Sequence, residues 1–126
     1  MDVNLADVHQ EVTAAFQRYE AALVGNDVEV LDALFWSSAH VIRYGATENL
    51  HGQDEILAFR KSRPSKGLDR TLRNTVITTF GRDFATANTE FTRPGTTRIG
   101  RQSHSWARLP EGWRIVAAHV SWVDES

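Results

Sequence analysis

The second half of the chain alternates between apolar and polar residues, and this alternation restricts the possible folds more than any other feature. Successive side chains of a β-strand point to opposite faces, so a period of two predicts strands that are buried on one face. Four such segments cover residues 70–80, 83–93, 97–109 and 113–123. The segments between them are Gly81-Arg82, Pro94-Gly95 and Pro110-Glu111-Gly112, which predicts a four-stranded meander.

The last of these turns also predicts how the final two strands pair. Pro110-Glu111-Gly112 suits a three-residue hairpin loop, in which Pro starts a type I turn and Gly takes the left-handed bulge position. The predicted register pairs Leu109 with Trp113, Ser103 with His119, and Arg101 with Ser121. One face then carries Arg101, Ser103, His119 and Ser121, and the other carries Gln102, His104, Trp106, Val116, Val120 and Trp122.

Either face of this hairpin is able to line a cavity. We expect Arg101 and His119 to point inward as substrate-binding residues, because their small neighbours leave room for a ligand. The alternative is a hydrogen-bond network at a subunit interface, with the opposite face of the hairpin turned inward.

The first half of the chain is predicted to be mainly helical. Apolar residues spaced by three and four predict a helix over about residues 5–24, capped by Asn4 with Asp7 and ended by Gly25-Asn26. The stripe consists of Leu5, Val8, Val12, Phe16, Tyr19 and Leu23. Asn26 and Glu29 have capping-box spacing and start a short second helix that holds Leu31, Leu34 and Phe35. A strand is predicted at 40–44, a third helix at 52–63 before Pro64, and a loop at 64–69.

This order of elements predicts one α+β domain over residues 1–126. Its 126 residues, 41% of them apolar, suffice for one core. Three N-terminal helices pack on one side of a mostly antiparallel sheet. Because long strands twist, the sheet is expected to be highly curved and to form a cone with an internal pocket.

The composition argues against several kinds of partner. The 14 basic and 16 acidic residues are mixed along the chain, so no surface that follows nucleic-acid phosphates is indicated. No apolar stretch approaches the roughly 20 residues that span a bilayer. The N-terminal segment lacks the pattern of a signal peptide and the chain has no cysteine, which together indicate a cytoplasmic protein.

The same residues predict a site without a metal or cofactor. The absence of cysteine removes thiolate nucleophiles and Cys-based zinc sites. The five histidines show no metal-ligand spacing, and no nucleophile-elbow pattern is present. Arg60 and Arg63 on the third predicted helix are expected to form surface or interface ion pairs.

Several strings of the sequence together resemble the AtzH-like family of the nuclear transport factor 2-like superfamily, which has the cystatin-like cone fold and includes SnoaL-like relatives. They are FW at 35–36, VIRYGATENLHG at 41–52, AFRKSRP at 58–64, TTFGRDFATANTEF at 78–91, GRQSHSW at 100–106 and GWRIVAAHVSW at 112–122. The resemblance implies a small-molecule amidohydrolase of nitrogen catabolism that converts 1,3-dicarboxyurea to allophanate. It also implies catalytic roles for a tyrosine on the first helix and an arginine on the first strand. By motif these are Tyr19 in FQRYEAAL and Arg43 in VIRYG.

From the residues alone, Tyr19 and Arg43 each have two interpretations. Tyr19 is either a core tyrosine that binds a backbone carbonyl or a proton donor in the pocket. Arg43 is either paired with an acid such as Glu48 or placed at the pocket base, where its planar fork suits a carboxylate. In the second case its charge would also lower the pKa of a neighbouring tyrosine. Trp36, which follows the second helix, is either a core residue or the floor of the pocket.

Three functional hypotheses follow. The first is a cofactor-independent hydrolase or lyase for a small carboxylated amide, with Tyr19 and Arg43 in catalysis. The second is a non-catalytic ligand-binding or accessory module that partners an amidase. The third is a scaffold dimer whose cavity is filled by side chains. In each case a homodimer through the sheet is expected, because relatives of this fold often dimerise in that way.

Overall fold

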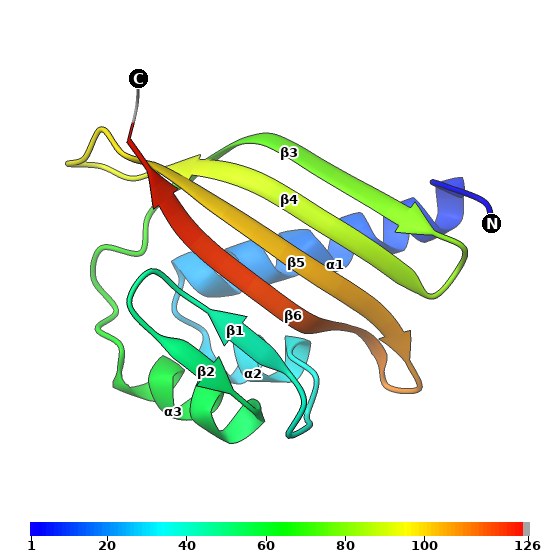
Figure 1. The fold of residues 1–126 in the computed structure, drawn as a ribbon, viewed down its shortest axis with the longest axis horizontal. Coiled ribbons are helices and arrows are strands. Elements are labelled where there is room, and N and C mark those ends of the chain that lie inside the picture. The colour runs from blue at the N-terminus through cyan, green and yellow to red at the C-terminus, as the bar shows by residue number, and fades with distance from the viewer. Residues whose placement is uncertain (125–126) are drawn as a thin grey trace.

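The chain forms a curved sheet that is crossed on one face by a long helix (Figure 1). A computed structural model describes residues 1–124. Its helices are α1 (Ala6–Val24), α2 (Val28–Leu34) and α3 (Gln53–Ser62). Its strands are β1 (Ile42–Tyr44), β2 (Asn49–His51), β3 (Thr71–Phe80), β4 (Phe84–Thr92), β5 (Ile99–Leu109) and β6 (Gly112–Val123). The predicted α+β class is therefore confirmed.

The sheet has the strand order β2-β1-β6-β5-β4-β3. β1 runs parallel to β6, and all other neighbours are antiparallel. Helix α1 lies behind β3–β6 in the view of Figure 1, whereas α2 and α3 lie beside β1 and β2. β2 was not predicted, because Asn49–His51 is only three residues long and has no fully buried residue to mark an inner face.

The β5–β6 hairpin departs from its predicted register near the turn. Ser103 pairs with His119 and Arg101 with Ser121, as predicted, but Leu109 pairs with Gly112 rather than with Trp113. The loop is therefore one residue shorter than expected. A bulge between Ser105 and Trp106 leaves one extra residue on β6 and restores the predicted pairing beyond it.

The predicted N-caps of the first two helices are wrong, whereas the predicted end of the first helix at Gly25-Asn26 is confirmed. The N-cap of α1 is Leu5 without a side-chain hydrogen bond, because Asn4 is used elsewhere. Asn4 has a φ of 59°, and its side chain accepts a hydrogen bond from the Thr79 amide at 2.9 Å. At α2 the cap is Asp27, which accepts from the Val30 amide at 3.2 Å. Asn26 instead has a φ of 51° and ends α1, a conformation that asparagine tolerates better than most residues.

The core lies between α1 and the inner face of the sheet. Val12 and Phe16 of α1 are buried, and on the sheet Trp106 and Ile115 are both 0% exposed. Each large apolar side chain buried in this way contributes about 1.5–3 kcal/mol. The alternation in β5 places Gln102, His104 and Trp106 inside, so this face of the hairpin is the inner one. No helix in residues 1–124 is long and apolar enough to cross a membrane.

Phe91 on β4 packs over Gly100, its partner on β5. A Cβ on Gly100 would lie 2.1 Å from Cζ of Phe91. We therefore expect Gly100→Ala to lower the free energy of unfolding by about 1–3 kcal/mol through overpacking. Urea unfolding measures this cost. In a Phe91→Leu background the cost should shrink, and an equal cost in both backgrounds would contradict the proposed clash.

Candidate functional site

A cavity of about 150 Å³ lies between the C-terminal half of α1, the end of α3 and the inner face of the sheet. Its lining residues are Tyr19, Leu23, Arg43, Ala46, Glu48, Phe59, Arg63, Arg70, Phe91, Arg93, Gln102, Val120 and Trp122. At about 30 Å³ per water, this volume holds a small polar molecule rather than a nucleotide. A larger hollow of about 480 Å³ near the start of α3 is more open and is lined mostly by exposed residues.

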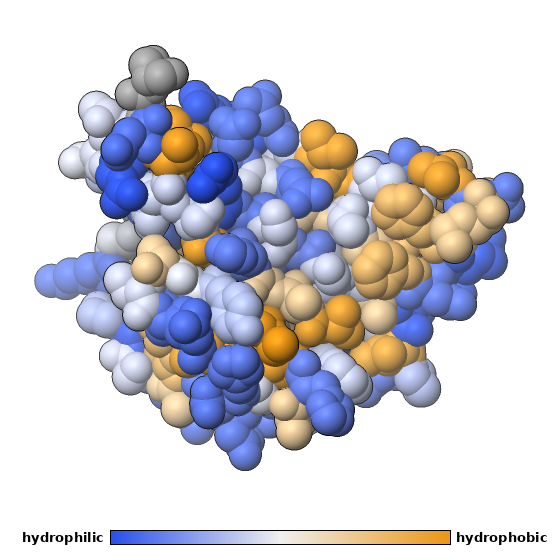
Figure 2. Space-filling model, viewed as in Figure 1, coloured by the Kyte–Doolittle hydropathy of each residue, from blue (hydrophilic) through white to orange (hydrophobic). Residues whose placement is uncertain are grey.

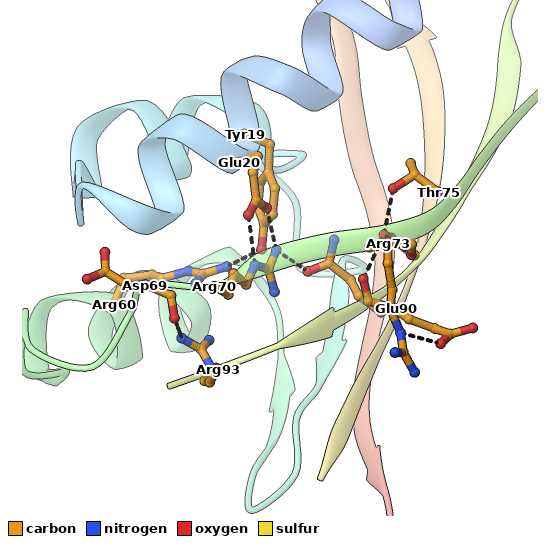
Figure 3. Close-up of polar contacts among 11 residues, drawn as sticks. Tyr19, Glu20, Arg60, Asp69, Arg70, Arg73, Thr75, Glu90 and Arg93 are labelled. Carbon is orange, nitrogen blue, oxygen red and sulfur yellow. Dashed lines mark hydrogen bonds and ion pairs between the residues drawn. The ribbon is translucent and has the colours of Figure 1, made fainter. Parts of the chain in front are cut away.

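Tyr19 reaches this cavity from the buried stripe of α1. Its side chain is 1% exposed, and its ring packs edge-on against the His104 ring with centroids 4.6 Å apart. Its hydroxyl accepts a hydrogen bond from Nη2 of Arg60 at 3.4 Å (Figure 3). The Tyr19 ring therefore belongs to the core, but its hydroxyl faces a cation instead of a backbone carbonyl.

Arg43 forms part of the cavity wall and is also paired with Glu48. The Arg43 residue is 6% exposed, and its Nη1 donates to Oε1 of Glu48 at 2.7 Å. The turn between them needs Gly45, because a Cβ there would lie 1.8 Å from Oε1 of Glu48. Burial raises the pKa of Glu48, but hydrogen bonds from Thr47 and Arg43 outweigh it and lower the pKa. Glu48 is thus an anion at neutral pH.

Arg60 is the most unusual residue of the site. It is 1% exposed, and its Nε and Nη1 have no hydrogen-bond partner within residues 1–124. Its guanidinium lies 5.5 Å from the Phe35 ring centroid. The prediction of surface ion pairs for Arg60 and Arg63 is wrong, since neither forms an ion pair in the described part of the chain. Both side chains point inward from the C-terminal end of α3, toward the cavity rather than toward solvent.

Arg70 and Arg93 come from the facing ends of β3 and β4. Arg70 donates to both carboxylate oxygens of Glu20, at 2.9 and 2.5 Å, and to Oε1 of Gln102 at 3.0 Å (Figure 3). Arg93 donates to the backbone carbonyls of Gly67 at 2.9 Å and Asp69 at 3.3 Å. Both guanidinium groups lie over the ring of Phe91, at 4.5 and 5.3 Å from its centroid.

The site therefore has more cations than anions. Arg43, Arg60, Arg63, Arg70 and Arg93 face only two paired carboxylates, those of Glu20 and Glu48.

This imbalance changes how two buried side chains ionise. Burial raises the pKa of Tyr19, but the positive charges of Arg60, Arg70 and Arg43 outweigh it and bring the pKa below 10.0. Burial, followed by the same three arginines, holds the pKa of His104 well below 6.5. His104, which packs against the Tyr19 ring, is consequently neutral at pH 7, and Tyr19 is a stronger acid than a free phenol.

The other predicted site residues do not line the cavity. Arg101 and His119 are exposed on the outer face of the sheet, so the expectation that they point inward is wrong. The inner face needs large side chains to fill the space under α1, and Trp106 in the opposite register supplies one. Trp36 lies partly buried after α2, with its ring 6.2 Å from that of His40, and it does not floor the pocket.

Sequence reasoning missed Arg70 and Arg93, although a signal for them was present. The β3–β4 hairpin pairs Phe80 with Phe84 at its turn, and an irregularity between Arg73 and Val76 shifts the register so that Thr71 pairs with Thr92. The next residue outward on each strand is an arginine. The hairpin therefore brings the two cations to one end of the sheet. Within residues 1–124, no three His, Asp or Glu side chains gather in a way that could hold a metal ion.

The fold and the enclosed cavity define a nuclear transport factor 2-like domain. A protein of this superfamily from Salmonella enterica serovar Typhimurium LT2 has 26% identity and a TM-score of 0.77, with 96% of this chain and 94% of that chain covered. The chain belongs to the AtzH-like family, whose model matches residues 1–126.

Two solved structures are much more similar to this chain. A protein of unknown function from Pectobacterium atrosepticum SCRI1043 has 67% identity and a TM-score of 0.96, covering 98% of this chain and 96% of that one. A cystatin-like fold protein from Burkholderia xenovorans LB400 has 49% identity and a TM-score of 0.96, with 100% and 99% covered. No curated protein matches the chain.

The charge balance around Tyr19 leads to a spectroscopic prediction. The chain has two tyrosines, so Tyr44→Phe leaves Tyr19 as the only one. Its ultraviolet tyrosinate absorbance should titrate below the ordinary value of 10.0. Adding Arg60→Gln should raise the pKa, because it removes a cation that favours the charged phenolate. Arg98→Gln, which removes an exposed cation outside the cavity, serves as the control. An unchanged titration after Arg60→Gln would contradict the assigned interaction.

Proposed function

We propose that this protein is a cofactor-free enzyme that cleaves a small carboxylated urea or amide, such as 1,3-dicarboxyurea, in nitrogen-compound catabolism. The observation that carries the proposal is the buried Tyr19 hydroxyl, which faces a cavity with an excess of arginines. Such a cavity attracts small carboxylates, and its one acidic hydroxyl is placed to move a proton. Membership of the AtzH-like family supports the same chemistry.

Arg43 is the residue proposed to hold the reacting end of the substrate. Its planar guanidinium can donate two parallel hydrogen bonds to a carboxylate. Glu48 and the ring of Phe59, 5.0 Å from the guanidinium carbon of Arg43, fix its orientation before the ligand arrives. Because the carboxylate loses its charge as the C–N bond breaks, Arg43 would lower the barrier by polarising the adjacent carbonyl, where negative charge develops. Donors fixed in advance can contribute several kcal/mol in this way.

Tyr19 is proposed to supply the proton. In 1,3-dicarboxyurea the bond between a terminal carboxylate carbon and its nitrogen breaks, and the electron pair stays on nitrogen. That nitrogen takes the proton of the Tyr19 hydroxyl, and the carbon leaves as carbon dioxide, or as bicarbonate if water adds to it first. The other product is allophanate. Arg60 stabilises the tyrosinate until a proton from water restores the hydroxyl.

Turnover of 1,3-dicarboxyurea and related ureido acids tests this function. Tyr19→Phe should lower kcat by roughly 10²- to 10⁴-fold, because it removes the proton donor and keeps the ring. Arg43→Ala should lower kcat/KM, because the carboxylate loses its charged partner. Tyr44→Phe is the matched control, since Tyr44 lies on the outer face beside His119.

If all of these variants were as active as the unchanged protein, the catalytic roles proposed for Tyr19 and Arg43 would be contradicted. Tight binding of small acids without product, together with co-purification of an amidase, would instead favour an accessory module.

We also propose that the protein forms a homodimer through the outer face of the sheet. This face exposes Val76 (57%) and Phe84 (41%), and Ser103 and His119 lie between them and β1. Figure 2 shows this side, where apolar residues lie mainly over the right half of the face and hydrophilic residues cover most of the left half.

Light scattering after size-exclusion chromatography tests the dimer. The unchanged protein should run as a dimer, and Ser103→Arg should shift it to the monomer. A two-fold axis brings the same surface of both copies together, so the new charges would repel one another. Ser65→Arg in the exposed 64–69 loop is the matched control. A monomeric unchanged protein would contradict the proposal.

A further inference from the structure

Two of the arginines that line the cavity have no carboxylate partner. Arg43 is neutralised by Glu48, and Arg70 is neutralised by Glu20. Arg63 and Arg93 also line the cavity, but neither forms an ion pair within residues 1–124. Two neutralised and two unneutralised cations therefore line one small space.

Arg63 has donors that are buried and unused. Its Nε and Nη2 are shielded from solvent and have no hydrogen-bond partner in the described part of the chain. Its guanidinium lies 5.6 Å from the centroid of Phe59, the same ring that Arg43 contacts at 5.0 Å. Burial, followed by repulsion from Arg60 and Arg43, lowers the pKa of Arg63 to about 10, so it remains charged at neutral pH.

Arg93 is held in place without being neutralised. Carbonyl groups of Gly67 and Asp69 accept hydrogen bonds from its Nη1, and the Phe91 ring lies 5.3 Å away. Backbone carbonyls orient the guanidinium, but they leave its positive charge uncompensated. Arg63 and Arg93 thus form a second cationic wall, in addition to Arg43.

We propose that Arg63 and Arg93 form a second anion subsite, which binds the distal carboxylate of a small dianionic ligand while Arg43 binds the other. The identity of the ligand as a substrate rests on the proposed function, whereas the subsite itself rests on the unpaired cations. A buried donor without a partner is costly, and a carboxylate oxygen would satisfy it. The subsite therefore selects dianions over monoanions of the same size.

Malonate and malonamate test this selectivity directly. They share a three-carbon skeleton, but malonamate has a neutral amide in place of one carboxylate. Calorimetry at constant ionic strength should show malonate binding roughly 10- to 100-fold more tightly, which corresponds to one charge-assisted hydrogen-bonded pair. Arg63→Gln should remove most of this preference while malonamate binding stays within about threefold.

Control variants separate the subsite from general electrostatics. Arg98→Gln removes an exposed cation and should leave both affinities unchanged. Arg63→Lys, which keeps the charge, should retain part of the preference. Arg93→Gln provides the same test, at a side chain without shielded donors that lack a partner within residues 1–124, if Arg63→Gln does not fold. Equal loss of malonate and malonamate binding in the folded variants, or no loss of either, would overturn the subsite.

Different experimental results would contradict the proposed subsite and the proposed function. If malonate selectivity depends on Arg63 but no carboxylated urea is turned over, the subsite stands and the enzymatic function fails. If Arg63→Gln turns over a dianionic substrate with unchanged KM, the function stands and the subsite fails.

Discussion

The site depends on one contact, between the Tyr19 hydroxyl and the buried guanidinium of Arg60. Tyr19 comes from the C-terminal half of α1 and Arg60 from the end of α3, so the contact joins two residues that are 41 positions apart in the chain. A guanidinium this deep would normally pair with a carboxylate. Because it faces a phenol instead, burial and charge oppose one another at the same atom. The pKa of both groups falls, because burial lowers the pKa of Arg60 and the surrounding arginines lower the pKa of Tyr19 although it is fully buried.

The other arginines are tolerated at buried positions because contacts with aromatic rings partly replace the hydration of their guanidinium groups. Phe35, Phe59 and Phe91 each lie within cation–π distance of one or two guanidinium groups. Glu48 and Glu20 neutralise Arg43 and Arg70, but the remaining cations keep the cavity positive. The environment therefore disfavours an apolar ligand and favours a small anion. This selectivity comes from the arrangement of paired and unpaired arginines rather than from the shape of the cavity alone.

Much of the fold followed from local patterns, whereas the site did not. The stripe of α1 and the turns of the meander predicted where elements begin and end, because period and turn chemistry are local. Local patterns could not predict which face of β5 points toward the core. The pattern allows Arg101 or Gln102 to point inward, and only packing under α1 decides between them. Arg60 was misassigned for a similar reason, since an arginine near a helix end is usually solvated and the cavity that buries it is formed by distant strands.

The unpaired arginines also bear on how α3 is held. Within residues 1–124, no hydrogen bond joins α3 to β3, β4, β5 or β6, and its polar contacts run to Asp32, Ser38, His51 and Tyr19. Arg63 directly follows α3, and Arg93 directly follows β4. An anion that binds both therefore connects α3 to the far end of the sheet, which the protein alone does not do through hydrogen bonds.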